Sequence, residues 1–293
     1  SGAENANGII INPFTGDILA MASIPDYDPN TYWNYDVSNF LNKTISISYE
    51  PGSTFKLIPL AAALESGAFN DNEKIFCENG EYQIHPSRKI HDHEPHQSLS
   101  ISEILIHSSN IGIAKLANIL GPKVTYESLR KFGIGTKTGI DLPSEAKGSL
   151  RELNSWSRLS HLMVSMGQEF SITNIQLSMI YASIANGGYL LKPQIIKKIR
   201  SIDGEKNHAE IKVVRKVMTE RESNRIIKIL EKAVSEGTGT NAIIDENAIA
   251  GKTGTAEKFI GGSYSKEEFV SSFASVFPSS NPIYTCIISV DSP

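Results

Sequence analysis

Cysteine is scarce in this sequence, and its scarcity narrows the classes of protein to which the chain can belong. The 293 residues include only Cys77 and Cys286, which lie far apart. Two distant cysteines provide neither the spacing of a zinc site nor a disulfide framework, so we expect both thiols to be unpaired. They leave the redox compartment undecided.

The sequence also lacks a large excess of charge of one sign and lacks long apolar runs. The formal net charge is -4, so no surplus of lysine and arginine points to nucleic acid or an anionic membrane as the partner. No apolar run approaches the roughly 20 residues that span a bilayer, and no signal-peptide pattern opens the chain. We expect a globular enzyme with a large core, and any membrane anchor must lie outside this sequence.

Apolar segments of strand length occur at both ends of the chain. Residues 8–12 and 18–22 are separated by a Pro/Gly turn, and residues 248–252, 269–274 and 283–290 provide three more candidates. The middle, about 45–236, has helical patterns. These features predict one mixed α/β (α+β) domain over residues 1–293, with a single sheet formed by the two chain ends.

Three helix boundaries are marked by local signals. Ser100 to Glu103 and Thr219 to Glu222 have the spacing of a capping box, and apolar residues at helical intervals follow each one. A further helix is predicted from Ile175 to Ile184. It should end at Asn186-Gly187-Gly188, because glycine tolerates the left-handed cap conformation.

The first candidate for chemistry is the S-x-x-K segment from Ser53 to Lys56. A helix that begins near Ser53 would put the lysine amine beside the serine hydroxyl, where it can act on the hydroxyl proton. Pro59 should cause a local kink, because it has no N–H to donate. Ser263 to Lys266 has the same spacing, but we expect it in a polar connection between strands, where no helix aligns the pair.

Two more short motifs follow. Ser108 and Asn110 could relay a proton and hold a substrate amide, although on their own a polar junction between helices is the better explanation. The segment Lys252-Thr253-Gly254-Thr255 leaves a strand. We expect residues 252–256 on an edge strand that faces the cleft, where the lysine and hydroxyls can bind a carboxylate and the glycine lets an extended peptide approach. Lys137 begins a second K-T-G copy in a loop, which is the weaker candidate.

S-x-x-K, S-x-N and K-T-G in this chain order resemble the motif set of penicillin-binding proteins and class A β-lactamases. Nearly the whole chain is similar to class B penicillin-binding proteins, which are peptidoglycan D,D-transpeptidases. The matching segments are Asn12-Pro13-Phe14-Thr15-Gly16-Asp17-Ile18-Leu19-Ala20-Met21, Tyr49-Glu50-Pro51-Gly52-Ser53-Thr54-Phe55-Lys56, His107-Ser108-Ser109-Asn110, Thr138-Gly139-Ile140-Asp141-Leu142-Pro143 and Gly251-Lys252-Thr253-Gly254-Thr255-Ala256. Tyr-Glu-Pro-Gly before Ser53 favours a division-type member over an elongation-type one.

The resemblance implies a β-lactamase-like fold with a five-stranded antiparallel sheet and an inserted helical part. It also implies that the family's membrane anchor, pedestal domain and carboxy-terminal helix lie outside this chain. The expected partners are peptidoglycan stem peptides, β-lactam antibiotics and other cell-division or wall-synthesis membrane proteins. The expected location is the extracytoplasmic (periplasmic) face of the cytoplasmic membrane, in the bacterial cell envelope, and no cofactor or nucleic acid is expected.

The resemblance also implies a role for each site residue. Lys56 takes the proton of Ser53, while Lys252 keeps Lys56 neutral and pairs with the substrate carboxylate. The N–H groups of Ser53 and Thr255 form the oxyanion hole, Ser108 passes the proton to the leaving amine, and Asn110 holds the peptide amide. Thr253 and Gly254 complete the substrate-binding segment.

Two alternatives stay open. A D,D-carboxypeptidase or β-lactamase of the same fold is one, but Leu150 stands where class A β-lactamases have the glutamate of E-x-x-L-N. A penicillin sensor or scaffold that acylates without turnover is the other, because such a protein keeps the same three motifs.

Two other features suggest sites. His85, His91, His93 and His96 lie close to Asp92 and Glu94 in sequence, but their spacing is irregular, so we expect solvated loop histidines and no metal. Gly237 to Thr240 resembles a phosphate-binding loop. It follows a predicted helix rather than preceding one, so a turn is expected there.

Overall fold

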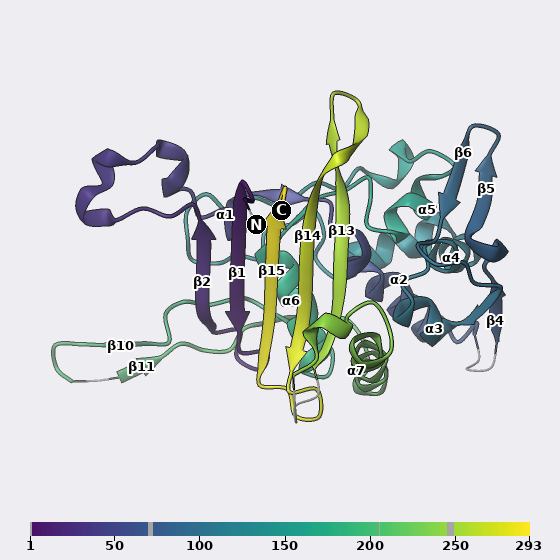
Figure 1. The fold of residues 1–293 in the computed structure, drawn as a ribbon. Coiled ribbons are helices and arrows are strands. Elements are labelled where there is room, and N and C mark those ends of the chain that lie inside the picture. The colour runs from purple at the N-terminus through teal and green to yellow at the C-terminus, as the bar shows by residue number, and fades with distance from the viewer. Residues whose placement is uncertain (1, 70–72, 205, 245–248) are drawn as a thin grey trace.

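A five-stranded antiparallel sheet forms the centre of the protein (Figure 1). The computed structural model describes residues 2–69, 73–204, 206–244 and 249–293. The strand order is β13, β14, β15, β1, β2, which confirms the predicted fold and places 252–256 on an edge strand, as predicted. The strands are β1 (Asn5–Ile11), β2 (Ile18–Ile24), β13 (Ala250–Ile260), β14 (Ser263–Phe277) and β15 (Tyr284–Asp291).

The two chain ends are joined through β1 and β15. Their pairing runs from Asn5 opposite Asp291 to Ile11 opposite Thr285. Side chains of a strand alternate between the two faces of a sheet, so every second residue can enter the core. On the covered face of these two strands Ile9, Ile11 and Ile287 are fully buried.

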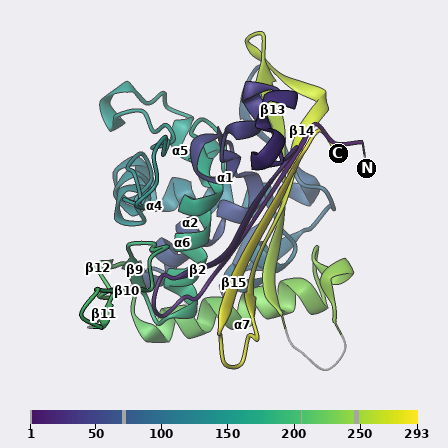
Figure 2. The ribbon, with the colours of Figure 1, turned by 90° about the vertical axis from the view of Figure 1, so that its left-hand side faces the viewer.

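Helices pack against one face of the sheet. Figure 2 shows α2, α4 and α6 on the same side of the strands. All residues of α6 are buried, and the helix contacts β1, β14 and β15. None of the helices among the described residues is both long and apolar enough to cross a bilayer. The helices are α1 (Lys43–Ser46), α2 (Leu57–Ser66), α3 (Ile101–Ile106), α4 (Asn110–Lys131), α5 (Ser160–Ser165), α6 (Asn174–Ala185) and α7 (Glu220–Ser235).

The predicted helix boundaries are confirmed. Ser100 caps α3 and Thr219 caps α7, each in a reciprocal capping box. The helix predicted at 175–184 is α6, and it ends where Gly187 adopts a φ of 83°. A third capping box, in which Thr173 and Gln176 start α6, was not recognised from the sequence.

The middle of the chain is less purely helical than the sequence predicted. Short segments there pair into small two-stranded sheets between the helices. Both cysteines, one of them in this region, are free thiols, as expected. The pairs are β3 (Ser48–Tyr49) with β8 (Ile172–Thr173), β4 (Lys74–Phe76) with β7 (Ser98–Ser100), β5 (Glu81–His85) with β6 (Arg88–His91), β9 (Tyr189–Leu191) with β12 (Val213–Lys216), and β10 (Lys198–Arg200) with β11 (Lys206–His208).

The segment that carries Ser53 differs from the regular helix that the spacing predicted. A 3₁₀ turn, η3 (Gly52–Phe55), comes first, and the α-helix α2 begins at Leu57. Pro59 lies in the first turn of α2, where a missing N–H costs no hydrogen bond within the helix. Residues three apart eclipse each other in a 3₁₀ turn, so Ser53 and Lys56 still lie on one side.

Candidate active site

Buried contacts hold the turn that carries Ser53. The hydroxyl of Tyr181, on α6, donates to the carbonyl oxygen of Thr54 at 2.9 Å. The ring of Phe55 packs on that of Phe170, with centroids 4.5 Å apart. Ser53 itself is partly exposed, whereas its neighbours on either side are buried. The turn is therefore held on its buried side, and the Ser53 hydroxyl lies on its exposed side.

Lys56 is fully buried and links the turn to the S-x-N motif. Its Nζ donates to Ser108 O at 2.5 Å, to Asn110 Oδ1 at 2.6 Å and to Ser108 Oγ at 3.2 Å. Burial lowers the pKa of Lys56 well below its ordinary value, and the nearby charge of Lys252 lowers it further, while Asp92 opposes both. The structure thus favours a neutral amine between two polar groups of S-x-N.

The backbone of the S-x-N motif is held in an unusual conformation. Ser108 has a φ of 58°, a region that residues other than glycine rarely adopt. Asp92 accepts hydrogen bonds from the Ser109 hydroxyl at 2.6 Å and from the N–H groups of Asn110 and Ile111 at 2.5 and 3.0 Å. A carboxylate at the N-terminus of α4 also complements the helix dipole. Asp92 therefore positions the motif.

Lys252 is 1% exposed and lies beside the turn that follows α7. Its Nζ donates to the hydroxyl of Thr238 at 2.9 Å and to Thr253 O at 3.3 Å. The Thr253 hydroxyl also donates to Thr238 Oγ1, at 3.1 Å. Burial lowers the pKa of Lys252 to about 7. The Lys252 side chain is thus covered by the hydroxyls of Thr238 and Thr253 and does not project into solvent.

The K-T-G strand packs directly on the turn that carries Ser53. A Cβ atom added at Gly254 would lie 2.8 Å from Ser272 Oγ, 2.9 Å from Thr54 Cγ2 and 3.0 Å from Pro51 O. The glycine therefore lets β13 approach this turn, whereas its expected role was to let substrate approach.

A cleft passes over Ser53. Two adjoining hollows, of about 440 and 520 Å³, share Ser53, Asn110 and Thr255 in their walls. Ser108 and Thr253 line the larger one. The structure thus brings the three predicted motifs together along one cleft, with Lys252 buried beside it.

Both duplicate motifs lie elsewhere. Ser263 and Lys266 belong to β14, so this segment is part of a strand and not the connection that we expected. Residues three apart on a strand point to opposite faces, so the serine and lysine are not aligned. Lys137 is exposed and lies near Leu190 and Arg215, in the wall of a different hollow.

The roles of Thr238, Asp92 and Glu50 at the site were not expected from the sequence. Thr238 lies in the Gly237 to Thr240 segment, which is a turn as expected but also lines the cleft. Glu50 accepts hydrogen bonds from the N–H of Glu169 and from the hydroxyl of Tyr264, and Tyr264 lines the smaller of the two hollows. Motif spacing gave no signal for these residues, because each acts through a segment distant in the chain.

Burial raises the pKa of Glu50 to about 7. A raised carboxyl pKa means that the folded protein holds a proton that the unfolded chain releases, so this group's contribution to stability falls as pH rises from about 4.5 to about 7. Glu50→Gln removes that loss. The melting temperature of the variant relative to the parent should therefore rise between pH 4.5 and pH 8. A difference that is constant with pH, or that falls, contradicts the assignment.

Taken as chemistry, the cleft has a serine on a rigid turn, a buried lysine of lowered pKa three residues further along that turn, and a second lysine under hydroxyls. These are the parts of a serine–lysine acyl-transfer site. The model of the penicillin binding protein transpeptidase domain matches residues 8–293. The chain belongs to the penicillin-binding protein transpeptidase family.

Individual relatives agree with this membership. The chain is 34% identical to stage V sporulation protein D of Bacillus subtilis, over 97% of this chain and 45% of that protein. It is 31% identical to the peptidoglycan D,D-transpeptidase FtsI homolog of Mesostigma viride, over 99% of this chain and 53% of that protein. The chain thus spans about half the length of these curated relatives.

A solved structure has the same fold. Penicillin binding protein 3 of Mycobacterium tuberculosis, complexed with aztreonam, superposes with a TM-score of 0.90 at 29% identity. The match covers 100% of this chain and 68% of that one. The arrangement of sheet and helices described above is therefore that of a penicillin-binding transpeptidase domain.

Proposed function

We propose that this chain is the catalytic domain of a peptidoglycan D,D-transpeptidase that works through an acyl-enzyme on Ser53. The observation that carries the proposal is the buried Lys56, whose amine is hydrogen-bonded to Ser108 and Asn110 beside the cleft. A neutral amine can accept the proton of Ser53 as its oxygen attacks the carbonyl between two D-alanines of a stem peptide. The N–H groups of Ser53 and Thr255 then stabilise the oxyanion.

The proton has a path to the leaving amine. Lys56 Nζ lies 3.2 Å from Ser108 Oγ, so the Ser108 hydroxyl can receive a proton from Lys56 and donate one to the departing D-alanine. Asn110 Oδ1 accepts from Lys56, and its amide nitrogen donates to His91 O at 2.9 Å. These two contacts fix the Asn110 side chain at the cleft, where it contacts the peptide amide.

The substrate carboxylate binds over the K-T-G strand. Hydroxyls of Thr253 and Thr255 line the cleft there, and the Lys252 ammonium lies below Thr238 and Thr253. A bound carboxylate favours the protonated form of Lys252, whose charge then lowers the pKa of Lys56 further. Substrate binding thereby helps to keep the general base neutral.

Lys252→Gln should remove both effects. Losing one partner of a buried charge pair typically costs about 2 kcal/mol or more, which is a factor of about 30 or more in the acylation rate constant. Stopped-flow acylation by benzylpenicillin measures it. Lys137→Gln changes the lysine of the second K-T-G copy and should acylate like the parent. Equal rates for Lys252→Gln and the parent would remove Lys252 from the site.

An amine from a neighbouring stem peptide completes the reaction. It attacks the Ser53 ester, forms the crosslink and returns the serine hydroxyl. The names of the relatives support a role in septal wall synthesis, and the aztreonam complex of one neighbour supports acylation by β-lactams. In the full-length protein the domain would stand on a pedestal and a membrane anchor, at the extracytoplasmic face of a bacterial envelope, near other wall-synthesis membrane proteins.

Product analysis tests the function. The chain is incubated with a stem pentapeptide as donor and an amine-bearing stem peptide as acceptor, and the products are separated by mass. A transpeptidase forms a crosslinked dimer and one D-alanine per crosslink. Hydrolysed donor without dimer would indicate a carboxypeptidase. Acylation by penicillin without any product would indicate a sensor, and either result would overturn the proposal.

A further inference from the structure

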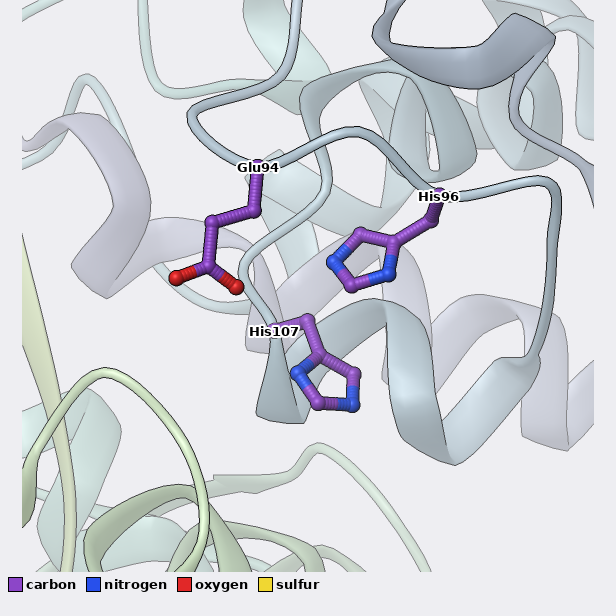
Figure 3. A group of neighbouring side chains, drawn as sticks. All are labelled: Glu94, His96 and His107. Atoms are coloured by element: carbon purple, nitrogen blue, oxygen red, sulfur yellow. The ribbon is translucent and has the colours of Figure 1, made fainter.

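Three potential metal ligands meet at the margin of the cleft. One ligand atom from each of Glu94, His96 and His107 lies within 4.8 Å of the other two. Figure 3 shows both imidazole rings presenting a nitrogen on the side of the Glu94 carboxylate. The rings of His96 and His107 pack together, with centroids 4.8 Å apart. In the sequence His96 is close to His85, His91 and His93, whereas His107 lies outside that group.

Of the other histidines of that group, His93 lines the same hollow as Glu94 and His107, but it is not one of the three residues whose ligand atoms meet. His85 lies on β5, and its Nδ1 is 2.8 Å from Ser87 Oγ. His91 lies at the end of β6, where its Nδ1 is 3.8 Å from a Glu81 carboxylate oxygen. The fold therefore brings His96, one of the four histidines that are close in sequence, together with His107 at the end of α3.

One atom of the cluster lacks a partner. His96 Nε2 is buried and has no hydrogen-bond partner among the described residues. Buried polar atoms are nearly always paired, so an unpaired one calls for an explanation. A metal ion bonded to this nitrogen would satisfy it.

We propose that Glu94, His96 and His107 bind a divalent transition-metal ion, with Zn²⁺ the best fit. Two imidazoles and one carboxylate form a ligand set that zinc sites use with a fourth position open to water. Glu94 and His107 line the cleft, so that fourth position faces solvent. Tetrahedral bonds of about 2.0 to 2.1 Å put ligand atoms about 3.3 Å apart. The three ligand atoms lie within 4.8 Å of one another, so binding requires small side-chain movements that bring them closer.

The ion would connect two segments that shape the active site. Glu94 lies two residues after Asp92, which holds Ser109 and Asn110 in place. His107 immediately precedes Ser108. A bound ion therefore fastens the 92–96 segment to the end of α3 and restricts the S-x-N motif from both sides.

Metal binding is tested on the whole chain without any activity assay. Zn²⁺ alone is titrated against a chromophoric chelator, with Mg²⁺ as the control ion. The parent should bind one Zn²⁺ per chain and no Mg²⁺. Glu94→Gln and His96→Gln should each weaken Zn²⁺ binding at least about tenfold, because even losing a residue that merely orients a ligand typically costs 10- to 100-fold. His85→Gln, outside the cluster, should bind like the parent.

A second measurement guards against a variant that fails to fold. Co²⁺ added to the parent should produce the visible absorption of a tetrahedral site, and Zn²⁺ should abolish it. Glu94 is exposed, so Glu94→Gln should keep the parent's melting temperature and lose this spectrum. Absent Zn²⁺ binding by the parent, or equal binding by Glu94→Gln and the parent, would overturn the proposal.

Discussion

Lys56→Arg is expected to slow the acylation of Ser53 by benzylpenicillin by about 100- to 10,000-fold, the usual effect of losing a general base. Arginine keeps the positive charge, but guanidinium does not deprotonate at any ordinary pH. The buried amine of Lys56, whose pKa is lowered by burial and by Lys252, is the group that can take the proton. Stopped-flow acylation kinetics measure the rate, and thermal unfolding shows whether the variant is folded.

Two further variants make this result interpretable. Lys56 is fully buried and arginine is larger, so Lys56→Met, which has a similar volume and no charge, is made alongside. Both should fold without acylating at the parent rate. Lys266→Arg repeats the change in the exposed second S-x-x-K and should have no effect. If a folded Lys56 variant acylates within a few-fold of the parent, Lys56 is an electrostatic or structural partner, and Ser108 becomes the better candidate for the base.

Ser53→Ala is expected to abolish the covalent penicillin adduct. The hydroxyl is the nucleophile, and alanine provides no atom that can form the ester. Intact-protein mass spectrometry should show a single adduct on the parent and none on the variant. The small loss of volume on a partly exposed side chain should leave thermal unfolding unchanged.

Ser263→Ala is the matched control for this change. Ser263 begins β14 in the second S-x-x-K segment, where strand geometry separates the serine from its lysine. This variant should acylate fully. An adduct that survives in Ser53→Ala and disappears in Ser263→Ala would mean that the nucleophile is in the other copy.

Local patterns predicted the elements that frame the site. Apolar segments of strand length marked the strands, and the capping boxes at Ser100 and Thr219 marked two helices, because both signals act between residues a few positions apart. Residues 252–256 were expected on an edge strand because an edge leaves room for an extended peptide to approach. The small sheets of the middle region were missed, because their strands are only two to five residues long.

The electrostatics of the site could not be predicted in the same way. The sequence suggested Lys252 as the cause of a neutral Lys56, but burial, which depends on the whole fold, is the larger cause. Thr238 contacts a lysine 14 residues further on, and Asp92 contacts a serine 17 residues away. Such pairs form only when the tertiary structure brings loops together, and spacing within a motif does not encode them.

The most direct measurement is a rapid quench of the unmodified chain with a labelled stem-peptide donor, followed by digestion and peptide mapping. The account predicts label on the peptide that contains Ser53, and loss of that label when an acceptor amine is added, at a rate that matches crosslink formation. Label on another residue, or crosslinked product formed without any label on Ser53, would contradict it.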